Sequence, residues 1–117
     1  MDFQIVDDKY FSQIIERLKD LVPEFQSVFD EQDGAYLILG EFGRYIIENI
    51  SNDLLLSKCT EFINEAISKG KYDTEDAIVI QVFQQLYNDN FTISKVRENL
   101  SPMALRLFDK FHVKHIE

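Results

Sequence analysis

Apolar residues recur every three or four positions along most of this chain, the spacing that places them on one face of an α-helix. Residues 10–22 follow this spacing, and Asp7 or Asp8 can cap the start of their helix with a carboxylate. Pro23 ends that helix, because proline lacks the backbone N–H that a helix interior needs. Since proline suits a first helical turn, Pro23 also predicts a short second helix that buries Phe25.

The second helix would also bury Val28 and Phe29, and it would end before the polar run at residues 30–34. Helical spacing resumes over residues 35–50, which predicts a longer third helix. The same spacing over residues 54–69 predicts a fourth.

Gly70 closes the fourth helix, and Asp73 or Thr74 is expected to cap a fifth, so these two helices form an antiparallel hairpin. The segment 77–83, Ala-Ile-Val-Ile-Gln-Val-Phe, is rich in β-branched residues. It is therefore the part of the chain where a strand competes most strongly with a helix.

The remaining pattern indicates a short helix near residues 94–99 and a last helix that starts at Ser101-Pro102. No linker or fixed repeat interrupts it. The sequence thus predicts one all-α domain over residues 1–117, with about six to eight helices in an irregular bundle of antiparallel hairpins or a HEAT-like stack. The predicted core residues are Phe11, Ile15, Leu18, Phe42, Ile46, Phe62, Ile63, Ile80, Phe83, Leu86, Leu105 and Phe108.

Two glycines stand three positions apart in the run ILGEFGRYII, residues 38–47. A dinucleotide-binding loop needs a third glycine between a strand and a helix, and a phosphate-binding loop needs a Gly-Lys-Ser/Thr ending. A loop that clamps a nucleic-acid backbone needs basic neighbours, whereas Glu41 separates these glycines. We interpret Gly40 and Gly43 as a slot on one helix that lets a second helix approach closely.

The net charge of the chain narrows the classes of molecule that it can bind. The chain has 21 acidic and 12 basic residues, a net charge of −9, and it is most acidic between residues 20 and 48. Such a surface repels nucleic-acid phosphates and anionic lipid, so we expect neither nucleic acid nor membrane as a partner. It attracts a basic protein, although acidic residues also serve simply to keep a small protein soluble.

Groups that could carry catalysis or bind a metal are few. Cys59 is the single cysteine, and His112 and His115 lie one helical turn apart without an evident third metal ligand. A calcium-binding loop aligned with Gly34 at its sixth position would begin at Phe29 and end at Gly40, so it would lack carboxylates at its first and last positions. We expect no enzymatic activity, no metal and no cofactor. A cytoplasmic location is expected because no secretory signal or bilayer-length apolar run is present.

The runs VPEFQSVFDEQDGAYLILGEFGRYIIENI and EFINEAISKGKYDTEDAIVIQVFQQLYNDN resemble small all-helical bacterial immunity proteins, including those of contact-dependent growth inhibition. They also resemble an uncharacterised bacterial helical domain family. The resemblance spans roughly residues 10–111, and its motifs are mostly core pattern. It implies a cytoplasmic protein that binds the basic C-terminal toxin domain, often a nuclease, of a large secreted effector and neutralises it. The alternative is a non-enzymatic helical adaptor or regulatory subunit that binds a basic protein.

The residues expected to bind the partner lie in or near two acidic turns, each with an aromatic residue beside it. Turns before the third and fifth helices are exposed because their backbone groups need water, and tyrosine is favoured at protein interfaces. The sequence leaves open whether the fold brings both turns to one face, and the alternative interpretation is that these charges are solvated helix caps. The predicted partner-binding residues are Asp30, Glu31, Asp33, Tyr36, Glu41, Tyr72, Asp73, Glu75 and Asp76.

Overall fold

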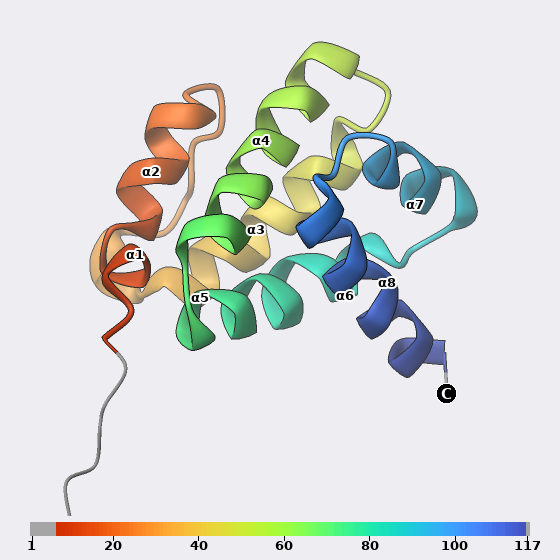
Figure 1. Cartoon of the computed structure of the whole chain (residues 1–117). Coiled ribbons are helices and arrows are strands. Elements are labelled where there is room, and N and C mark those ends of the chain that lie inside the picture. The colour runs from red at the N-terminus through yellow and green to blue at the C-terminus, as the bar shows by residue number, and fades with distance from the viewer. Residues whose placement is uncertain (1–6, 117) are drawn as a thin grey trace, which may run out of the picture.

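Capping side chains set the start of four helices in the computed structural model, which describes residues 7–116 (Figure 1). Asp8, Asn52, Asp89 and Ser101 each accept a hydrogen bond from a backbone N–H in the first turn that follows. The elements are α1 (Lys9–Ser12), α2 (Ile14–Leu21), the 3₁₀ turn η1 (Glu31–Asp33), α3 (Ala35–Glu48), α4 (Asp53–Lys69), α5 (Tyr72–Ala77), η2 (Ile78–Phe83), α6 (Gln84–Leu86), α7 (Asn90–Arg97) and α8 (Pro102–Ile116).

The elements α5, η2 and α6 form one continuous helix, because the backbone stays right-handed and helical at Ile78 and Gln84. Within it, η2 is a π-helical segment, in which each N–H bonds a carbonyl five residues back instead of four. With α5, η2 and α6 counted as one helix and the short 3₁₀ turn η1 left out, residues 7–116 contain seven helices and no strand. The predicted all-α class with six to eight helices is confirmed. The single domain was predicted for residues 1–117, of which 1–6 and 117 lie outside the described residues.

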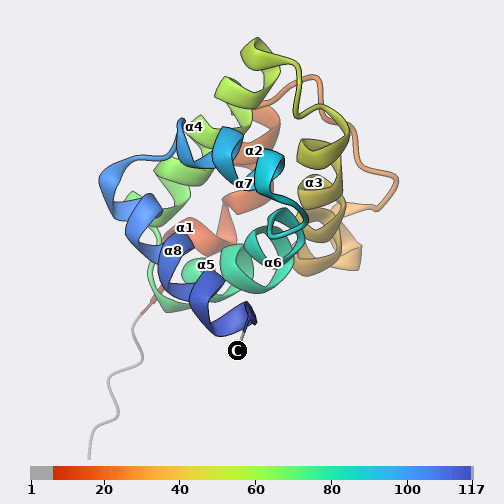
Figure 2. The ribbon, with the colours of Figure 1, turned by 90° about the vertical axis from the view of Figure 1, so that its right-hand side faces the viewer.

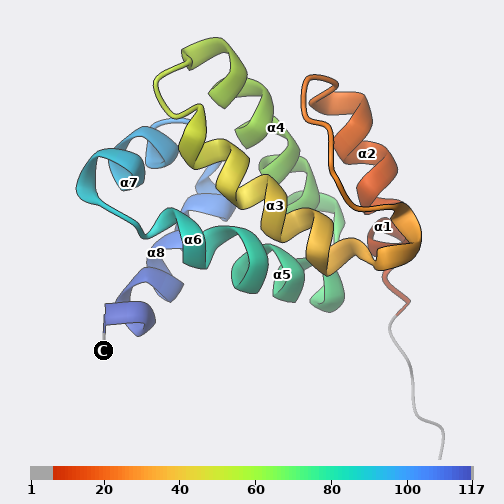
Figure 3. The same cartoon turned by 180° about the vertical axis from the view of Figure 1, so that it is seen from behind.

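Helix α4 runs through the middle of the bundle and contacts both α2 and α8. Helix α3 lies beside the α5–α6 helix, as Figures 2 and 3 both show. Aromatic side chains fill the space between these helices. The rings of Phe42 and Phe62 meet edge to face at 5.4 Å, and those of Phe83 and Phe108 do so at 5.1 Å.

A charged cluster fastens α2 to α4. Arg17 donates to both carboxylate oxygens of Glu65, with N–O distances of 2.9 Å, and the Tyr10 hydroxyl donates to Oε2 at 2.8 Å. The hydrogen bonds from Arg17 lower the pKa of Glu65 to about 2, which outweighs the opposing effect of burial. Glu65 therefore stays charged over the whole physiological pH range.

The predicted core is confirmed at most positions. The buried members are Leu18, Phe42, Ile46, Phe62, Ile63, Phe83, Leu86 and Phe108. Phe11, Ile15 and Leu105 are only partly buried and pack against the core. The prediction for Ile80 was wrong, because its side chain is 43% exposed. The π-helical segment shifts the face that its residues present, so the regular spacing of three and four no longer holds there.

Residues 22–30 form a loop, and the short helix predicted from Pro23 is absent. Phe25 is buried as expected, but Val28 is 87% exposed and Phe29 is 39% exposed. Tertiary contacts hold the loop instead. The ring of Phe25 packs edge to face on Phe42 at 5.4 Å, and the carboxylate of Glu41 accepts hydrogen bonds from the Val28 N–H at 2.9 and 3.1 Å.

Two helix boundaries differ from the predicted ones. The first predicted helix is broken at Gln13, whose φ of −114° and ψ of 6° separate α1 from α2. Helix α7 begins at Asn90, earlier than the predicted residues 94–99, because Asp89 accepts the Thr92 N–H at 2.7 Å and caps the helix there.

The start of α5 was also predicted wrongly, because neither Asp73 nor Thr74 caps it. The capping side chain is Asp8, which lies more than sixty residues earlier in the sequence. Asp8 Oδ2 accepts the backbone N–H groups of Lys71 and Thr74 at 3.0 and 2.8 Å, while its Oδ1 caps α1 through the N–H of Phe11 at 3.1 Å. One carboxylate thus joins the starts of two helices.

Candidate protein-binding surface

The two acidic segments predicted to bind a partner meet at Tyr36 and Asp76. The Tyr36 hydroxyl donates a hydrogen bond to Asp76 Oδ2 at 3.0 Å, which links the start of α3 to α5. Partial burial and this hydrogen bond raise the pKa of the Tyr36 hydroxyl, and the nearby charge of Asp73 adds to the effect. The sequence could not place the two turns, and the structure joins Tyr36, which follows the first turn, to Asp76 in α5.

Local geometry at the start of α3 aims Tyr36 toward α5. Gly34 ends the turn η1 with a φ of 104°, a conformation that other residues rarely adopt, and the chain enters α3 directly after it. The ring of Tyr36 then packs edge to face on Phe11 of α1, with centroids 6.2 Å apart. Contacts on two sides therefore hold the hydroxyl near Asp76.

The glycines Gly40 and Gly43 let α3 lie close against the α5–α6 helix, which confirms their interpretation as a packing slot. A Cβ atom at Gly43 would lie 2.6 Å from Gln85 Nε2 and 3.0 Å from the backbone oxygen of Gln81. Gln85 Nε2 fills the slot and donates to the carbonyl oxygen of Gly40 at 2.6 Å and to that of Gln81 at 2.7 Å.

The two helices run in the same direction along this seam (Figure 3). Tyr36 meets Asp76 at one end, and Gly43 meets Gln85 further along both helices. Because α3 and the α5–α6 helix are parallel neighbours, their solvent-facing side chains line one continuous strip.

Exposed apolar side chains border the seam. Leu37 follows Tyr36 and is 49% exposed, Ile80 precedes the seam residue Gln81 and is 43% exposed, and Tyr72 is 76% exposed at the start of α5. We refer to this strip as the Tyr36 face. Its members are Tyr36, Leu37, Tyr72, Asp73, Asp76 and Ile80.

The acidic turn η1 precedes α3 but contacts α2, and part of its charge is already paired. Glu31 forms a salt bridge with Lys19 of α2 at 2.7 Å. Asp33 accepts the backbone N–H of Asp30 at 2.8 Å in a reciprocal cap of the turn. Asp30 itself is exposed and forms no salt bridge within residues 7–116.

Glu41 and Glu75 also lie outside the Tyr36 face. Glu41 is turned toward the loop at 22–30, where it accepts the Val28 N–H. Glu75 is exposed on the side of α5 that borders α8, in a hollow that it shares with Met103 and Arg106. Of the nine predicted residues, the structure therefore groups four on this face, which are Tyr36, Tyr72, Asp73 and Asp76.

Leu37 and Ile80 are the members of the face that sequence reasoning missed. The apolar pattern placed Ile80 in the core, and only the π-helical segment exposes it. Leu37 carries a weak signal, because it precedes the buried stripe of α3, which begins at Ile38, and an isolated exposed leucine is ordinary in soluble proteins.

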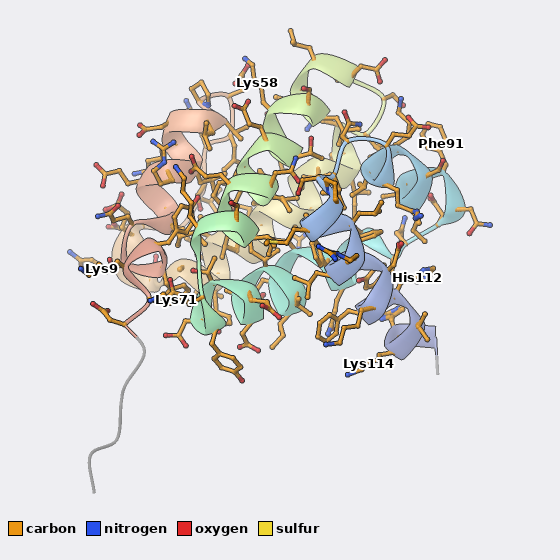
Figure 4. All side chains as sticks on the ribbon, viewed as in Figure 1. Lys9, Lys58, Lys71, Phe91, His112 and Lys114 are labelled. Carbon is orange, nitrogen blue, oxygen red and sulfur yellow. The ribbon has the colours of Figure 1, made fainter. Side chains whose placement is uncertain are left out.

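Cys59 on α4 and the two histidines on α8 lie outside the Tyr36 face. Over residues 7–116, no three His, Cys, Asp or Glu side chains gather closely enough to hold a metal ion. His112, labelled on α8 in Figure 4, stacks on Tyr87 with centroids 5.0 Å apart. Burial raises the pKa of the Cys59 thiol to about 12, which leaves a poor nucleophile. None of the helices in this range has both the length and the apolar content needed to cross a bilayer.

This chain belongs to a family described as a domain of unknown function (DUF7674), which matches residues 15–114. The match reaches from α2 to α8 and includes both helices of the Tyr36 face. No curated protein and no solved structure matches the chain. Because the family description states no activity, the immunity function and its adaptor alternative stay predictions.

Proposed function

We propose that this member of the DUF7674 family is an immunity protein that binds a basic toxin domain through the Tyr36 face and so neutralises it. The observation that carries this proposal is the hydrogen bond from Tyr36 to Asp76. It gathers carboxylates and exposed apolar side chains from two distant segments into one strip, and such a strip is the composition expected of a site for a basic protein.

Charge supports a basic partner. Asp73 and Asp76 form no salt bridge within residues 7–116, so their charge is available to an incoming cation. The net charge of −9 surrounds them with a negative field. Complementary fields speed the encounter of two proteins and disfavour partners of the wrong sign.

Apolar contact supplies the second requirement of a stable complex. Protein interfaces combine a central apolar cluster, often with tyrosine, and a polar rim. Tyr72, Leu37 and Ile80 provide the cluster here, while Asp73 and Asp76 lie beside them. A nuclease toxin would offer a matching surface, because the cleft that receives nucleic acid carries lysine and arginine.

Co-expression with the toxin domain that the proposal expects the neighbouring gene to encode tests the proposal. The wild-type chain should restore growth of cells that make the toxin domain, and Ile80→Asp should fail to do so. Val113→Asp is a matched control, because Val113 is an exposed apolar residue on α8, outside the Tyr36 face. Growth restored equally by both variants would remove the Tyr36 face from the binding site.

The same experiment separates the immunity function from the adaptor alternative. An adaptor would leave toxin-producing cells unprotected even at high expression of the wild-type chain. Its gene would also stand beside housekeeping genes instead of beside the toxin region of a large secreted protein. Absence of protection by the wild-type chain would therefore overturn the immunity proposal.

A further inference from the structure

Two hollows flank the acidic turn η1, on the side of the molecule formed by α2 and the loop at 22–30. The larger has a volume of about 570 Å³ and lies between α2, the loop and Ile38 of α3. The smaller, about 530 Å³, is lined by Phe11 and Ala35 among others. Both hollows include Ile15 and Glu31, so they open on either side of one shared wall.

The larger hollow, which we refer to as the loop pocket, has an apolar floor. Leu18, Phe25 and Ile38 line it and are themselves buried, with at most 6% of each side chain exposed. Phe29 forms part of one wall and keeps 39% of its surface exposed. A volume of this size lies within the range of pockets that hold a drug-sized ligand or a large side chain.

Contacts on three sides hold the loop that forms this pocket. Phe25 packs on Phe42 and Glu41 accepts the Val28 N–H. Glu24 forms a salt bridge with Lys58 of α4, labelled in Figure 4. These three contacts fix the position of the loop, and with it the shape of the pocket.

The rims of the two hollows carry a net negative charge. Lys19 is the one basic residue among the linings, and it pairs with Glu31 at 2.7 Å. This pairing leaves one carboxylate outside any salt bridge of residues 7–116 at each hollow, Asp30 at the loop pocket and Glu16 at the smaller one. An apolar floor below an acidic rim is complementary to an apolar side chain carried between basic residues.

The smaller hollow lies beside Tyr36. Phe11 lines the smaller hollow and packs on the Tyr36 ring. Ala35 lines the same hollow and precedes Tyr36 in α3. A partner segment that crosses the Tyr36 face can therefore continue over the smaller hollow and reach the loop pocket beyond the shared residues Ile15 and Glu31.

We propose that the loop pocket receives an apolar anchor side chain, flanked by lysine or arginine, from the basic protein that the Tyr36 face binds. This inference rests on the proposed function for the identity of the partner. It adds the anchor site and the sequence character of the partner segment, basic-apolar-basic. Buried anchors of this kind contribute most of the affinity in many protein complexes.

A peptide titration tests the pocket without any toxin. The probe is acetyl-Arg-Phe-Arg-amide, added to the full chain with labelled Ile, Leu and Val methyl groups and followed by NMR. The methyl signals of Ile15, Leu18 and Ile38 should shift together, with a Kd on the order of 1 mM for so small a ligand. The signals of Leu54 and Val113, which do not line the pocket, should stay in place.

Two control peptides separate the apolar and electrostatic parts of the inference. Acetyl-Arg-Ser-Arg-amide should not move the pocket signals, because it lacks the anchor. Acetyl-Glu-Phe-Glu-amide should bind at least about fivefold more weakly at low salt. Equal binding of the Glu and Arg peptides would overturn the acidic-rim argument. Absence of pocket shifts at about ten times the expected Kd would overturn the pocket itself.

Variants of two neighbouring loop residues localise the binding. Phe29→Ala removes part of the pocket wall and should weaken the Arg-Phe-Arg peptide about fivefold. Val28→Ala alters an exposed apolar residue that does not line the loop pocket, so it should leave the affinity within about twofold. Equal effects of the two substitutions would place the peptide elsewhere.

Failure of this inference is distinguishable from failure of the proposed function. Pocket shifts with the peptide, together with absent protection from the toxin, would retain the pocket and discard the immunity function. Protection from the toxin without pocket shifts would retain the immunity function and discard the pocket as an anchor site. Shifts of the pocket signals on simple dilution of the chain would assign the pocket to a second copy of this protein and overturn the inference.

Discussion

The carboxylate of Asp8 accepts a hydrogen bond from the backbone N–H of Thr74, 66 residues further along the chain, at 2.8 Å. The same carboxylate caps α1 through the N–H of Phe11. Burial alone would raise the pKa of Asp8, but the hydrogen bonds from Thr74, Phe11 and Lys71 lower it below its ordinary value. A single side chain therefore fixes the start of α5, from which Tyr72 projects at the Tyr36 face.

Removal of this cap should destabilise the fold. We expect Asp8→Ala to lower the free energy of unfolding by about 1–3 kcal/mol, because it leaves three backbone N–H groups without their acceptor. Asp7→Ala, at an exposed neighbouring carboxylate, should change it by less than about 0.5 kcal/mol. Urea denaturation of both variants measures the difference, and equal stabilities would show that Asp8 is not a structural cap.

The Arg17–Glu65 cluster predicts a defined pH dependence. The folded pKa of Glu65 is about 2, below its ordinary value of 4.5, so the ion pair contributes its full stability above about pH 4.5 and loses it as the pH falls toward 2. Glu65→Gln should therefore cost about 1–3 kcal/mol at pH 7 and progressively less below pH 4.5.

Glu61→Gln is the matched control for that experiment, because Glu61 lies on the same helix and is exposed. Its stability difference from the wild type should be small at every pH. Denaturant unfolding of both variants between pH 3 and pH 7 provides the comparison. A cost of Glu65→Gln that stays constant as the pH falls would contradict the assignment of the lowered pKa to the Arg17 hydrogen bonds.

The glycine slot can be tested with two single substitutions. Gly43→Ala should destabilise the fold by about 1–3 kcal/mol, because its Cβ would meet the anchored Gln85 amide and the Gln81 backbone. Gly40→Ala meets only the end of the Gln81 side chain at 3.0 Å, and the gain in helix propensity of about 1 kcal/mol offsets that contact. Thermal unfolding that ranks Gly40→Ala as the less stable variant would refute the slot.

Local patterns were sufficient for the parts of the fold that depend on local physics. Helical spacing correctly predicted α3, α4 and α8, and the cap at Ser101 followed by Pro102 starts α8 as expected. The errors arise where a distant group replaces a local one. Phe25 packs on Phe42 and the segment after Pro23 stays a loop, while Asp8 caps α5 in place of Asp73.

For the candidate site, the sequence predicted the residue types but not their arrangement in space. Acidic turns and nearby tyrosines can be recognised in a sequence, but the hydrogen bond between Tyr36 and Asp76 depends on how two helices pack. The exposure of Ile80 depends on the π-helical segment, which the spacing of apolar residues did not reveal. The loop pocket likewise requires tertiary contacts that hold residues 22–30 in place.

Charge reversal at the Tyr36 face should slow the encounter with a basic toxin domain. Asp73→Lys should reduce the association rate about threefold or more at low salt and should flatten its dependence on salt. Glu75→Lys is the matched control, because it lies in the same first turn of α5 but points toward α8. Stopped-flow mixing measures both rates, and an equal reduction would show that only the net charge matters.

The most direct test of the Tyr36 face is the Kd of the purified complex with the toxin domain that the immunity proposal expects the neighbouring gene to encode, measured by calorimetry. Tyr72 is 76% exposed, so Tyr72→Ala removes contact area without disturbing the core. Phe91→Ala is the control, at an aromatic that is 56% exposed on α7 (Figure 4). We predict that Tyr72→Ala weakens the complex at least about tenfold while Phe91→Ala stays within about twofold. Unchanged affinity for Tyr72→Ala, or a larger loss for Phe91→Ala, would contradict binding through the Tyr36 face.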